Sequence, residues 1–253
     1  MGTCKGVIKR IAPDADVIDI THGIPPQHVL RGALVLARTL PYMPVGIHVA
    51  VVDPGVGSRR NALVLASGDG RLHVGPDNGL LVLAAERLGG IVRAVEIVNR
   101  SYMLEPVSHT FHGRDIFAPA AAHLALGTPL EELGPSVEPE QLVRLVVPKP
   151  EIARGRIRTT VLHVDRFGNV QLNMTAADLA AAGIVAGERL EIEVGSRRYS
   201  ALAARTFADV RPGAMVLYED AYWNAALAVN GGNAAATLRA LVGQEVALWP
   251  AAA

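Results

Sequence analysis

The chain is short of cysteine and of aromatic residues, and its charges balance. The single cysteine, Cys4, permits no internal disulfide and no cysteine metal cluster, which fits a reducing cytoplasm. Aromatic residues make up 4% of the chain, which disfavours stacking of nucleic-acid bases. Basic and acidic residues number 24 each, so bulk charge attracts neither nucleic acid nor a membrane surface. We therefore expect a cytoplasmic protein with no nucleic-acid or membrane partner.

Sequence signals of several common protein classes are absent as well. No apolar run reaches the roughly 18 residues that a membrane helix requires, and the first residues do not resemble a signal peptide. The chain has no Gly-x-Gly-x-x-Gly, no phosphate-loop lysine, no Gly-x-Ser-x-Gly and no Cys-x-x-Cys. These absences disfavour a dehydrogenase, an NTPase, a serine hydrolase and a thiol redox enzyme.

Strand and helix patterns alternate through the first part of the chain. This alternation predicts an α/β domain with a mostly parallel sheet. A Gly-Asp-Gly turn at 68–70 indicates a hairpin between two of the strands. The predicted strands lie at 16–20, 48–52, 62–66, 72–74 and 92–98, and the predicted helices at 3–11, 29–40, 80–88 and 116–126.

The pattern changes near Pro148, where a proline-containing linker precedes a series of short strands with turn residues between them. Such a series is typical of a small all-β barrel or sandwich. We expect an α/β domain over residues 1–148 and a β-barrel domain over residues 149–253. The strands of the second domain are predicted at 157–164, 170–172, 189–194, 215–218, 225–229 and 246–249, and a helix at 234–241.

The stretch from His48 to Arg60 is the first candidate for a functional site. A β-branched apolar run ends in Asp53, and a proline and glycine-rich turn leads to Arg59 and Arg60. Open α/β sheets bind their ligands at the carboxyl ends of strands, which favours a role in chemistry for Asp53. The alternative is an ordinary strand exit with a solvent-exposed acid and base.

His112 is the second candidate, within Thr-Phe-His-Gly-Arg-Asp at 110–115. Gly113 lets the backbone approach a ligand, and a histidine ahead of a helix can act as acid, base or orienting group. A capping or core histidine is the alternative. His109 and His112 also form a possible metal pair, but no third ligand has a recognisable spacing.

The predicted barrel offers two further candidates. Asp165 and Asn169 flank a Phe-Gly turn, where the acid suits a cationic group and the amide suits the edge of a base. Tyr222 and the glycines of the Asn-Gly-Gly-Asn segment at 230–233 suit a flat ligand. Ordinary turns, one of them leading into the helix at 234–241, explain both segments equally well.

Five segments taken in order change this balance. They are VDPGVGSRR at 52–60, GPDNGLL at 75–81, TFHGRD at 110–115, DRFGNV at 165–170 and VNGGNAA at 229–235. Together they resemble the S-adenosyl-L-methionine (SAM) hydroxide adenosyltransferases, which are SAM hydrolases related to fluorinase and chlorinase, and the resemblance covers nearly the whole chain.

The resemblance implies that water or hydroxide attacks C5′ of SAM and releases adenosine and L-methionine. It implies a catalytic set of Asp53, Arg60 and His112, with no metal and no cofactor, since SAM is the substrate. The sulfonium leaves as a neutral thioether, so the barrier lies in aiming and activating the nucleophile. Asp53 and His112 are then expected to accept hydrogen bonds from the water, and Arg60 to stabilise hydroxide character.

The resemblance also implies a substrate-binding set and an assembly. Asp165 is expected to meet the methionine ammonium group, Asn169 the adenine edge and Phe207 the adenine ring. Tyr222 and the backbone near Val229 and Gly231 are expected to close the pocket. The resemblance implies a homotrimer in which each active site lies between the first domain of one subunit and the second domain of its neighbour.

The amino terminus departs from this resemblance. Family members usually begin with a strand and a Thr-Asp-Phe-Gly segment whose acid binds the ribose hydroxyls, whereas this sequence starts downstream of them. We expect the natural protein to be longer and its mass to exceed 26.7 kDa.

Two other functions remain open. A protein that binds SAM or adenosine without turnover is one, and a halogenase-like enzyme on the same scaffold is the other. Halogenases carry other residues at the acid and histidine positions, so Asp53 and His112 favour hydroxide over halide. A methyltransferase is disfavoured because the glycine-rich SAM loop of that fold is absent.

Overall fold

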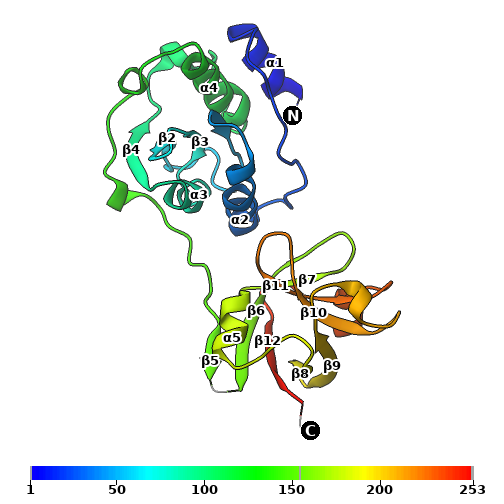
Figure 1. Cartoon of the computed structure of the whole chain (residues 1–253). Coiled ribbons are helices and arrows are strands. Elements are labelled where there is room, and N and C mark those ends of the chain that lie inside the picture. Colours follow the sequence, from blue (N-terminus) through cyan, green and yellow to red (C-terminus); the bar gives the residue numbers. More distant parts are fainter. Residues whose placement is uncertain (1, 154, 252–253) are drawn as a thin grey trace. The chain divides into compact units, whose positions relative to one another are not determined.

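The structure is a computed structural model that describes residues 2–153 and 155–251. The chain divides into two compact units, and the boundary falls between Val146 and Val147 (Figure 1). Each unit has a hydrophobic core of its own, so each is described separately. Among the described residues, no helix is both long enough and apolar enough to cross a membrane.

The first unit contains a four-stranded sheet with the order β1-β3-β2-β4. Only β1 and β3 run parallel, with Val49 opposite Val74, whereas β2 pairs antiparallel with both β3 and β4. The sheet is therefore mixed, and the expectation of a mostly parallel sheet is not confirmed. The reason is the predicted hairpin, which returns β3 alongside β2 through a turn with Gly70 at φ +88°. The strands are β1 (Ile47–Val49), β2 (Ala62–Ser67), β3 (Leu72–Pro76) and β4 (Ile91–Glu96).

Helices cover both faces of this sheet (Figure 1). Leu63 and Leu65 of β2 pack under α2 and α3, whereas Ala62 and Val64 point the other way, toward α4. This alternation follows from the two-residue period of a strand. The α-helices are α1 (Gly2–Ile11), α2 (Val29–Thr39), α3 (Val82–Arg87) and α4 (Ala118–Ala125). Shorter turns are η1 (Leu40–Tyr42), η2 (Arg100–Tyr102), η3 (Gly113–Phe117, of π type), η4 (Leu130–Glu132) and η5 (Pro139–Gln141).

One predicted strand of this unit is absent from the described structure. Residues 16–20 form neither a helix nor a strand, so the expected strand there is wrong for this structure. An alternating apolar pattern becomes a strand only when a neighbour supplies the ladder of backbone hydrogen bonds, and no described strand pairs with this segment.

The second unit is built on an eight-stranded sheet whose strands, all except β5, close into a barrel. Closure occurs where β12 pairs with both β8 and β6. The barrel confirms the predicted all-β architecture, although β9 was not among the predicted strands. The strands are β5 (Glu151–Ala153), β6 (Arg156–Val164), β7 (Val170–Leu172), β8 (Arg189–Val194), β9 (Arg197–Ala203), β10 (Met215–Glu219), β11 (Ala225–Val229) and β12 (Glu245–Pro250). The helical segments are α5 (Ala176–Ala181), η6 (Phe207–Asp209) and α6 (Ala234–Leu238).

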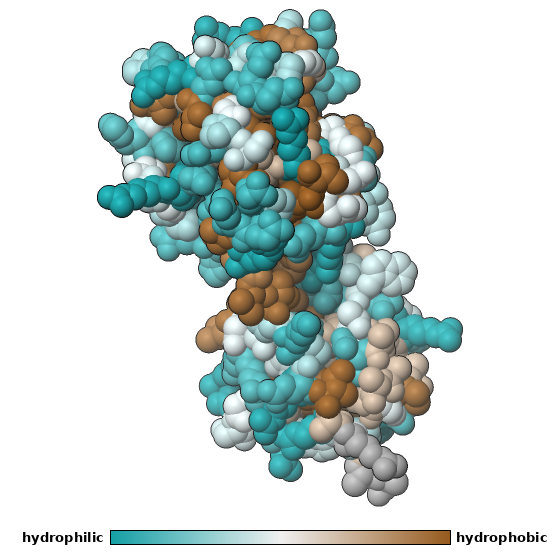
Figure 2. Space-filling view, turned by 90° about the vertical axis from the view of Figure 1, so that its left-hand side faces the viewer, coloured by the Kyte–Doolittle hydropathy of each residue, from teal (hydrophilic) through white to brown (hydrophobic). Residues whose placement is uncertain are grey.

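The surface is mostly hydrophilic on the face shown in Figure 2, with separate hydrophobic patches. Exposed aromatic side chains in the second unit include Phe167, Tyr222 and Trp223, which are 63%, 46% and 67% exposed. All three lie in turns between strands. Exposed aromatic side chains are enriched at surfaces that bind ligands or partners.

Candidate active site

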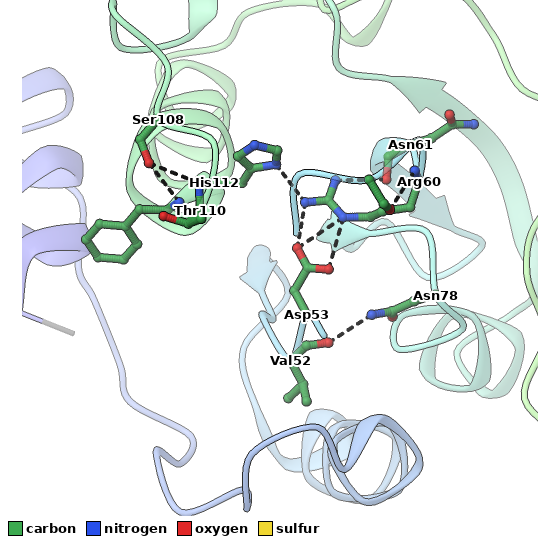
Figure 3. A network of polar contacts seen from close by, with 10 residues as sticks. Val52, Asp53, Arg60, Asn61, Asn78, Ser108, Thr110 and His112 are labelled. Carbon is green, nitrogen blue, oxygen red and sulfur yellow. Dashed lines mark hydrogen bonds and ion pairs between the residues drawn. The ribbon is translucent and has the colours of Figure 1, made fainter. Parts of the chain in front are cut away.

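Asp53 lies four residues beyond the end of β1 and is nearly buried. Its side chain is 5% exposed, and that of Arg60 is 10% exposed. Arg60 Nε lies 3.0 Å from both carboxylate oxygens, and Nη2 donates to Oδ2 at 2.5 Å (Figure 3). A charged pair held by several hydrogen bonds has a fixed orientation, so the acid and the base are placed by each other.

The loop between Asp53 and Arg60 lies against the segment that precedes His112. Gly57 has φ +77°, and a Cβ atom there would lie 2.6 Å from the carbonyl oxygen of His109. Any side chain at this position would therefore clash with backbone and strain the turn. The glycine-rich pattern at 55–57 thus allows two segments distant in sequence to approach each other.

His112 completes the cluster. Its Nδ1 atom lies 2.7 Å from Arg60 Nη2, and the two side chains point toward each other in Figure 3. A guanidinium group has only donors, so Nδ1 accepts and the neutral imidazole carries its proton on Nε2. Burial, followed by the nearby Arg60 charge, lowers the pKa of His112 below 6.5, which keeps the ring neutral at pH 7.

This arrangement changes one expectation from the sequence. We expected both Asp53 and His112 to accept hydrogen bonds from the nucleophile. With Nδ1 engaged by Arg60, the ring offers an N–H donor at Nε2 instead. The carboxylate of Asp53 remains an acceptor, since two oxygens provide about four lone-pair positions.

Two buried side chains, Phe117 and Asp115, hold parts of the Asp53–Arg60–His112 cluster in place. The Arg60 guanidinium carbon lies 5.3 Å from the centroid of the fully buried Phe117 ring. Asp115 accepts from the Ser108 backbone N–H at 2.9 Å and from Arg114 Nε at 2.5 Å. The hydrogen bond from Arg114 is the main reason that the pKa of Asp115 is lowered, so Asp115 stays ionised and holds the turn ahead of His112.

Asp165 and Asn169 lie together in the turn between β6 and β7. Asp165 Oδ1 accepts from the backbone N–H groups of Phe167 and Asn169 at 2.8 and 2.9 Å. Its Oδ2 accepts from Asn169 Nδ2 at 2.8 Å. The structure thus shows the turn that we considered as an alternative, and the roles of these residues in binding stay predictions.

Phe207 lies beside a tyrosine that the sequence analysis did not select. The ring centroids of Phe207 and Tyr218 are 4.7 Å apart. Burial, then the charges of Asp220 and Asp165, raise the pKa of Tyr218 to about 12. Tyr218 is therefore in contact with Phe207 and close enough to Asp165 to be affected by its charge. Its alternation with inward-facing Leu217 in β10 was the available sequence signal.

The remaining predicted residues lie in two other turns of the barrel unit, except Val229, which is the last residue of β11. The Tyr222 backbone N–H donates to Asp220 Oδ1 at 2.8 Å. Val229 accepts from the Gly232 N–H at 3.0 Å, and Gly231 has φ +70°. The 165–169 and 230–233 turns touch, because the place of a Cβ on Gly168 is filled by the Asn233 side chain.

The predicted residues therefore form two sets. Asp53, Arg60 and His112 form one bonded cluster in the first unit, and the other six belong to the second unit. No group of three or more His, Cys, Asp or Glu side chains within residues 2–153 and 155–251 is placed to hold a metal ion.

An α/β unit with a buried acid–guanidinium–imidazole cluster, followed by a closed β-barrel, defines a two-domain protein with a polar site of enzyme type. Residues 1–134 match the SAM hydroxide adenosyltransferase N-terminal domain, and residues 159–247 match the C-terminal domain of the same name. The chain belongs to the SAM hydroxide adenosyltransferase family.

Relatives and solved structures agree with this assignment. The chain is 50% identical to an (R)-S-adenosyl-L-methionine hydrolase from Salinispora tropica, over 97% of this chain and 91% of the relative. It is 39% identical to a hydrolase of the same name from Thermus thermophilus, over 96% and 92%. A fluorinase from an Actinoplanes species is 28% identical, over 90% and 85%. An uncharacterized conserved protein from Thermotoga maritima has a similar structure, with a TM-score of 0.91, 36% identity and coverage of 98% and 94%.

Proposed function

We propose that this protein hydrolyses SAM to adenosine and L-methionine without a metal or cofactor. The observation that carries the proposal is the buried cluster of Asp53, Arg60 and His112 in a chain of this family. The single cysteine supports a cytoplasmic site of action.

The reaction balances with water as the only co-substrate. The water oxygen forms a bond to C5′ while the C5′–S bond breaks. The electron pair of the broken C5′–S bond stays on sulfur and neutralises the sulfonium. Methionine leaves as a neutral thioether, so no acid is needed for the leaving group. Asp53 accepts the proton from the attacking water and passes it to solvent. The Arg60 charge and the His112 Nε2–H group stabilise and aim the developing hydroxide.

The second unit supplies the proposed binding groups for SAM. Asp165 pairs with the methionine ammonium group, Asn169 bonds the adenine edge, and Phe207 lies against the adenine ring. The neighbouring Phe167 and Tyr222 are 63% and 46% exposed, so two further aromatic side chains lie at the surface of this unit. The groups that close the pocket are Tyr222 and the backbone of Val229 and Gly231.

The direct test is to incubate the protein with SAM in ¹⁸O-labelled water and to separate the products by chromatography. We expect adenosine and methionine in equal amounts, unaffected by chloride, with the label in the 5′-hydroxyl group. A chlorinated nucleoside would instead identify a halogenase. Bound SAM without any product would identify a binding protein. Because the names of the hydrolase relatives specify the (R) epimer, the assay is run on each sulfonium epimer, and we expect turnover of (R)-SAM.

We also propose a homotrimer in which the first unit of one subunit and the second unit of its neighbour share a site. The division of the predicted residues between the two units supports this arrangement. The test is to co-express an Asp53→Asn subunit with an Asp165→Asn subunit and to isolate mixed assemblies. Shared sites restore roughly a third of the wild-type rate, because one of the three sites in each mixed trimer combines two intact halves. A rate no higher than the sum of the two variants would contradict shared sites.

A further inference from the structure

The strand that leads to Asp53 loses its backbone partner shortly before it reaches the acid. Leu72 N–H donates to the Gly46 carbonyl, and Ala50 N–H donates to the Val74 carbonyl, both at 3.0 Å. A parallel ladder repeats every two residues, so the next hydrogen bond would run from the backbone N–H of residue 76 to the Ala50 carbonyl oxygen. Residue 76 is proline, which has no N–H group. The ladder therefore ends there, and the chain from 51 to 53 continues outside the sheet.

A side chain holds the strand where the ladder no longer does. Asn78 Nδ2 donates to the Val52 carbonyl oxygen at 2.8 Å, as Figure 3 shows. Asn78 Oδ1 accepts from the Leu80 backbone N–H at 3.2 Å. These two bonds fix which end of the amide faces Val52, because only the NH₂ group can donate to a carbonyl.

The Val52 carbonyl belongs to the peptide bond that joins Val52 to Asp53. Fixing this peptide fixes the direction in which the Asp53 side chain leaves the backbone. Asp53 in turn orients Arg60, and Arg60 occupies Nδ1 of His112. A chain of contacts thus runs from Asn78 through the Val52–Asp53 peptide to the imidazole.

We infer that Asn78 is a positioning residue for the proposed reaction: its amide sets the Asp53 backbone and, through Asp53 and Arg60, the imidazole of His112. The inference rests on the proposed SAM hydrolysis for its kinetic consequence, but its geometric consequence at His112 is independent of any substrate. A displacement of about 1 Å at a reacting group can cost about 100-fold in rate.

The same unit contains a matched control. Asn99 Nδ2 donates to the Glu132 carbonyl oxygen at 2.8 Å, and Asn99 Oδ1 accepts from the Ser101 N–H at 3.0 Å. Asn78 and Asn99 therefore have the same bonding pattern and are both half-buried. They differ in that the carbonyl held by Asn99 does not adjoin the Asp53 cluster.

The experiment compares Asn78→Asp with Asn99→Asp, and adds Asn78→Ala in case the new carboxylate prevents folding. Either aspartate keeps the acceptor for its own turn and removes the donor to the distant carbonyl. We expect Asn78→Asp to lower kcat by about 10-fold to 100-fold with KM for SAM unchanged. Asn99→Asp is expected to keep the wild-type kcat. The imidazole nitrogen resonances of His112, assigned with His112→Ala, are expected to move in the Asn78 variants only.

The outcomes separate the two proposals. If the wild-type protein does not hydrolyse SAM and the His112 resonances still move in the Asn78 variants, the positioning role is kept and the proposed function is removed. Unshifted resonances, together with a wild-type kcat in both Asn78 variants, would overturn the positioning role. Equal losses of kcat in the Asn78 and Asn99 variants would also overturn it, because they would reveal a general loss of stability.

Discussion

The two units hold their acidic side chains in different ways. In the first unit, Asp53 is bonded by Arg60, seven positions along the chain, and Arg60 reaches His112, a further 52 positions on. In the second unit, Asp165 accepts hydrogen bonds from within its own turn, at most four positions away. The first arrangement exists only when distant segments have folded together, whereas the second is available to a short peptide. The proposed catalytic side chains are therefore positioned by contacts between distant segments, whereas the predicted binding turn at 165–169 is held by contacts within itself.

Removing one charge from each unit is expected to give the largest and most different effects. We expect Asp53→Asn to lower kcat by roughly 10²-fold to 10⁴-fold with little change in KM, because the acceptor of the water proton is lost. Asp165→Asn is expected to raise KM, because the methionine ammonium loses its partner. Steady-state kinetics on SAM measures both. Loss of kcat alone in both variants would remove the division of roles between the units.

A buried histidine in the first unit predicts a dependence of stability on pH. His73 is fully buried, and its Nε2 lies 3.0 Å from Ser67 Oγ, which donates to Asp69 at 2.8 Å. The His48 ring centroid is 5.8 Å away. Burial and then His48 lower the pKa of His73 from 6.5 to about 4. The folded state thus binds the proton less tightly than the unfolded state, and stability is fully present above pH 6.5.

On acidification from pH 6.5 toward pH 4, we expect His73 to remove about 3 kcal/mol from the free energy of unfolding. Urea unfolding at several pH values measures this slope. His73→Gln keeps a donor for Ser67 and does not titrate, so its slope is expected to be shallower. The same slope in both proteins would show that His73 is not the titrating group.

The close approach of two loops predicts a smaller effect. Gly57→Ala places a methyl group against the His109 carbonyl and forces a left-handed backbone on alanine, which costs about 1–2 kcal/mol before any clash. Gly55 has an ordinary φ, and a Cβ there would lie 3.4 Å from its nearest neighbour, so Gly55→Ala is the matched control. Denaturant midpoints of the two variants test this, and equal midpoints would contradict a special role for Gly57.

A local device in the second unit predicts the smallest effect. Thr175 caps α5 in a reciprocal arrangement with Asp178. Thr175→Ala is expected to lower the free energy of unfolding by about 1 kcal/mol. Thr175→Ser is expected to keep most of the stabilisation that the cap contributes. Both variants are expected to keep the wild-type kcat. A drop in kcat would show that this local cap is coupled to the reactive cluster.

Local patterns in the sequence predicted the elements, and their long-range pairing is where the predictions fell short. The hairpin, the helices around the sheet and the barrel strands other than β9 followed from periodicity and turn residues. The mixed sheet depends on which strands meet, and β9 begins with two arginines that hide its alternation. The segment at 16–20 has the pattern of a strand without a described partner.

The same limit applies to the candidate site. The resemblance selected Asp53, Arg60 and His112, and the structure brings these three side chains together. The proton position on His112 could not be predicted, because it depends on a donor 52 residues away. Asn78 was visible only as part of the GPDNGLL segment, since its role depends on the missing N–H group of Pro76 and on a carbonyl 26 positions earlier.

The closure of the barrel has a consequence for synthesis on the ribosome. β12 pairs with β6 and with β8, so the last described strand joins the first strand of the barrel. Until Glu245–Pro250 has left the exit tunnel, both of those strands keep an unpaired edge that can associate with other nascent chains. The second unit therefore completes its fold only after β12 has been translated, whereas the sheet of the first unit, which ends with β4, can assemble much earlier.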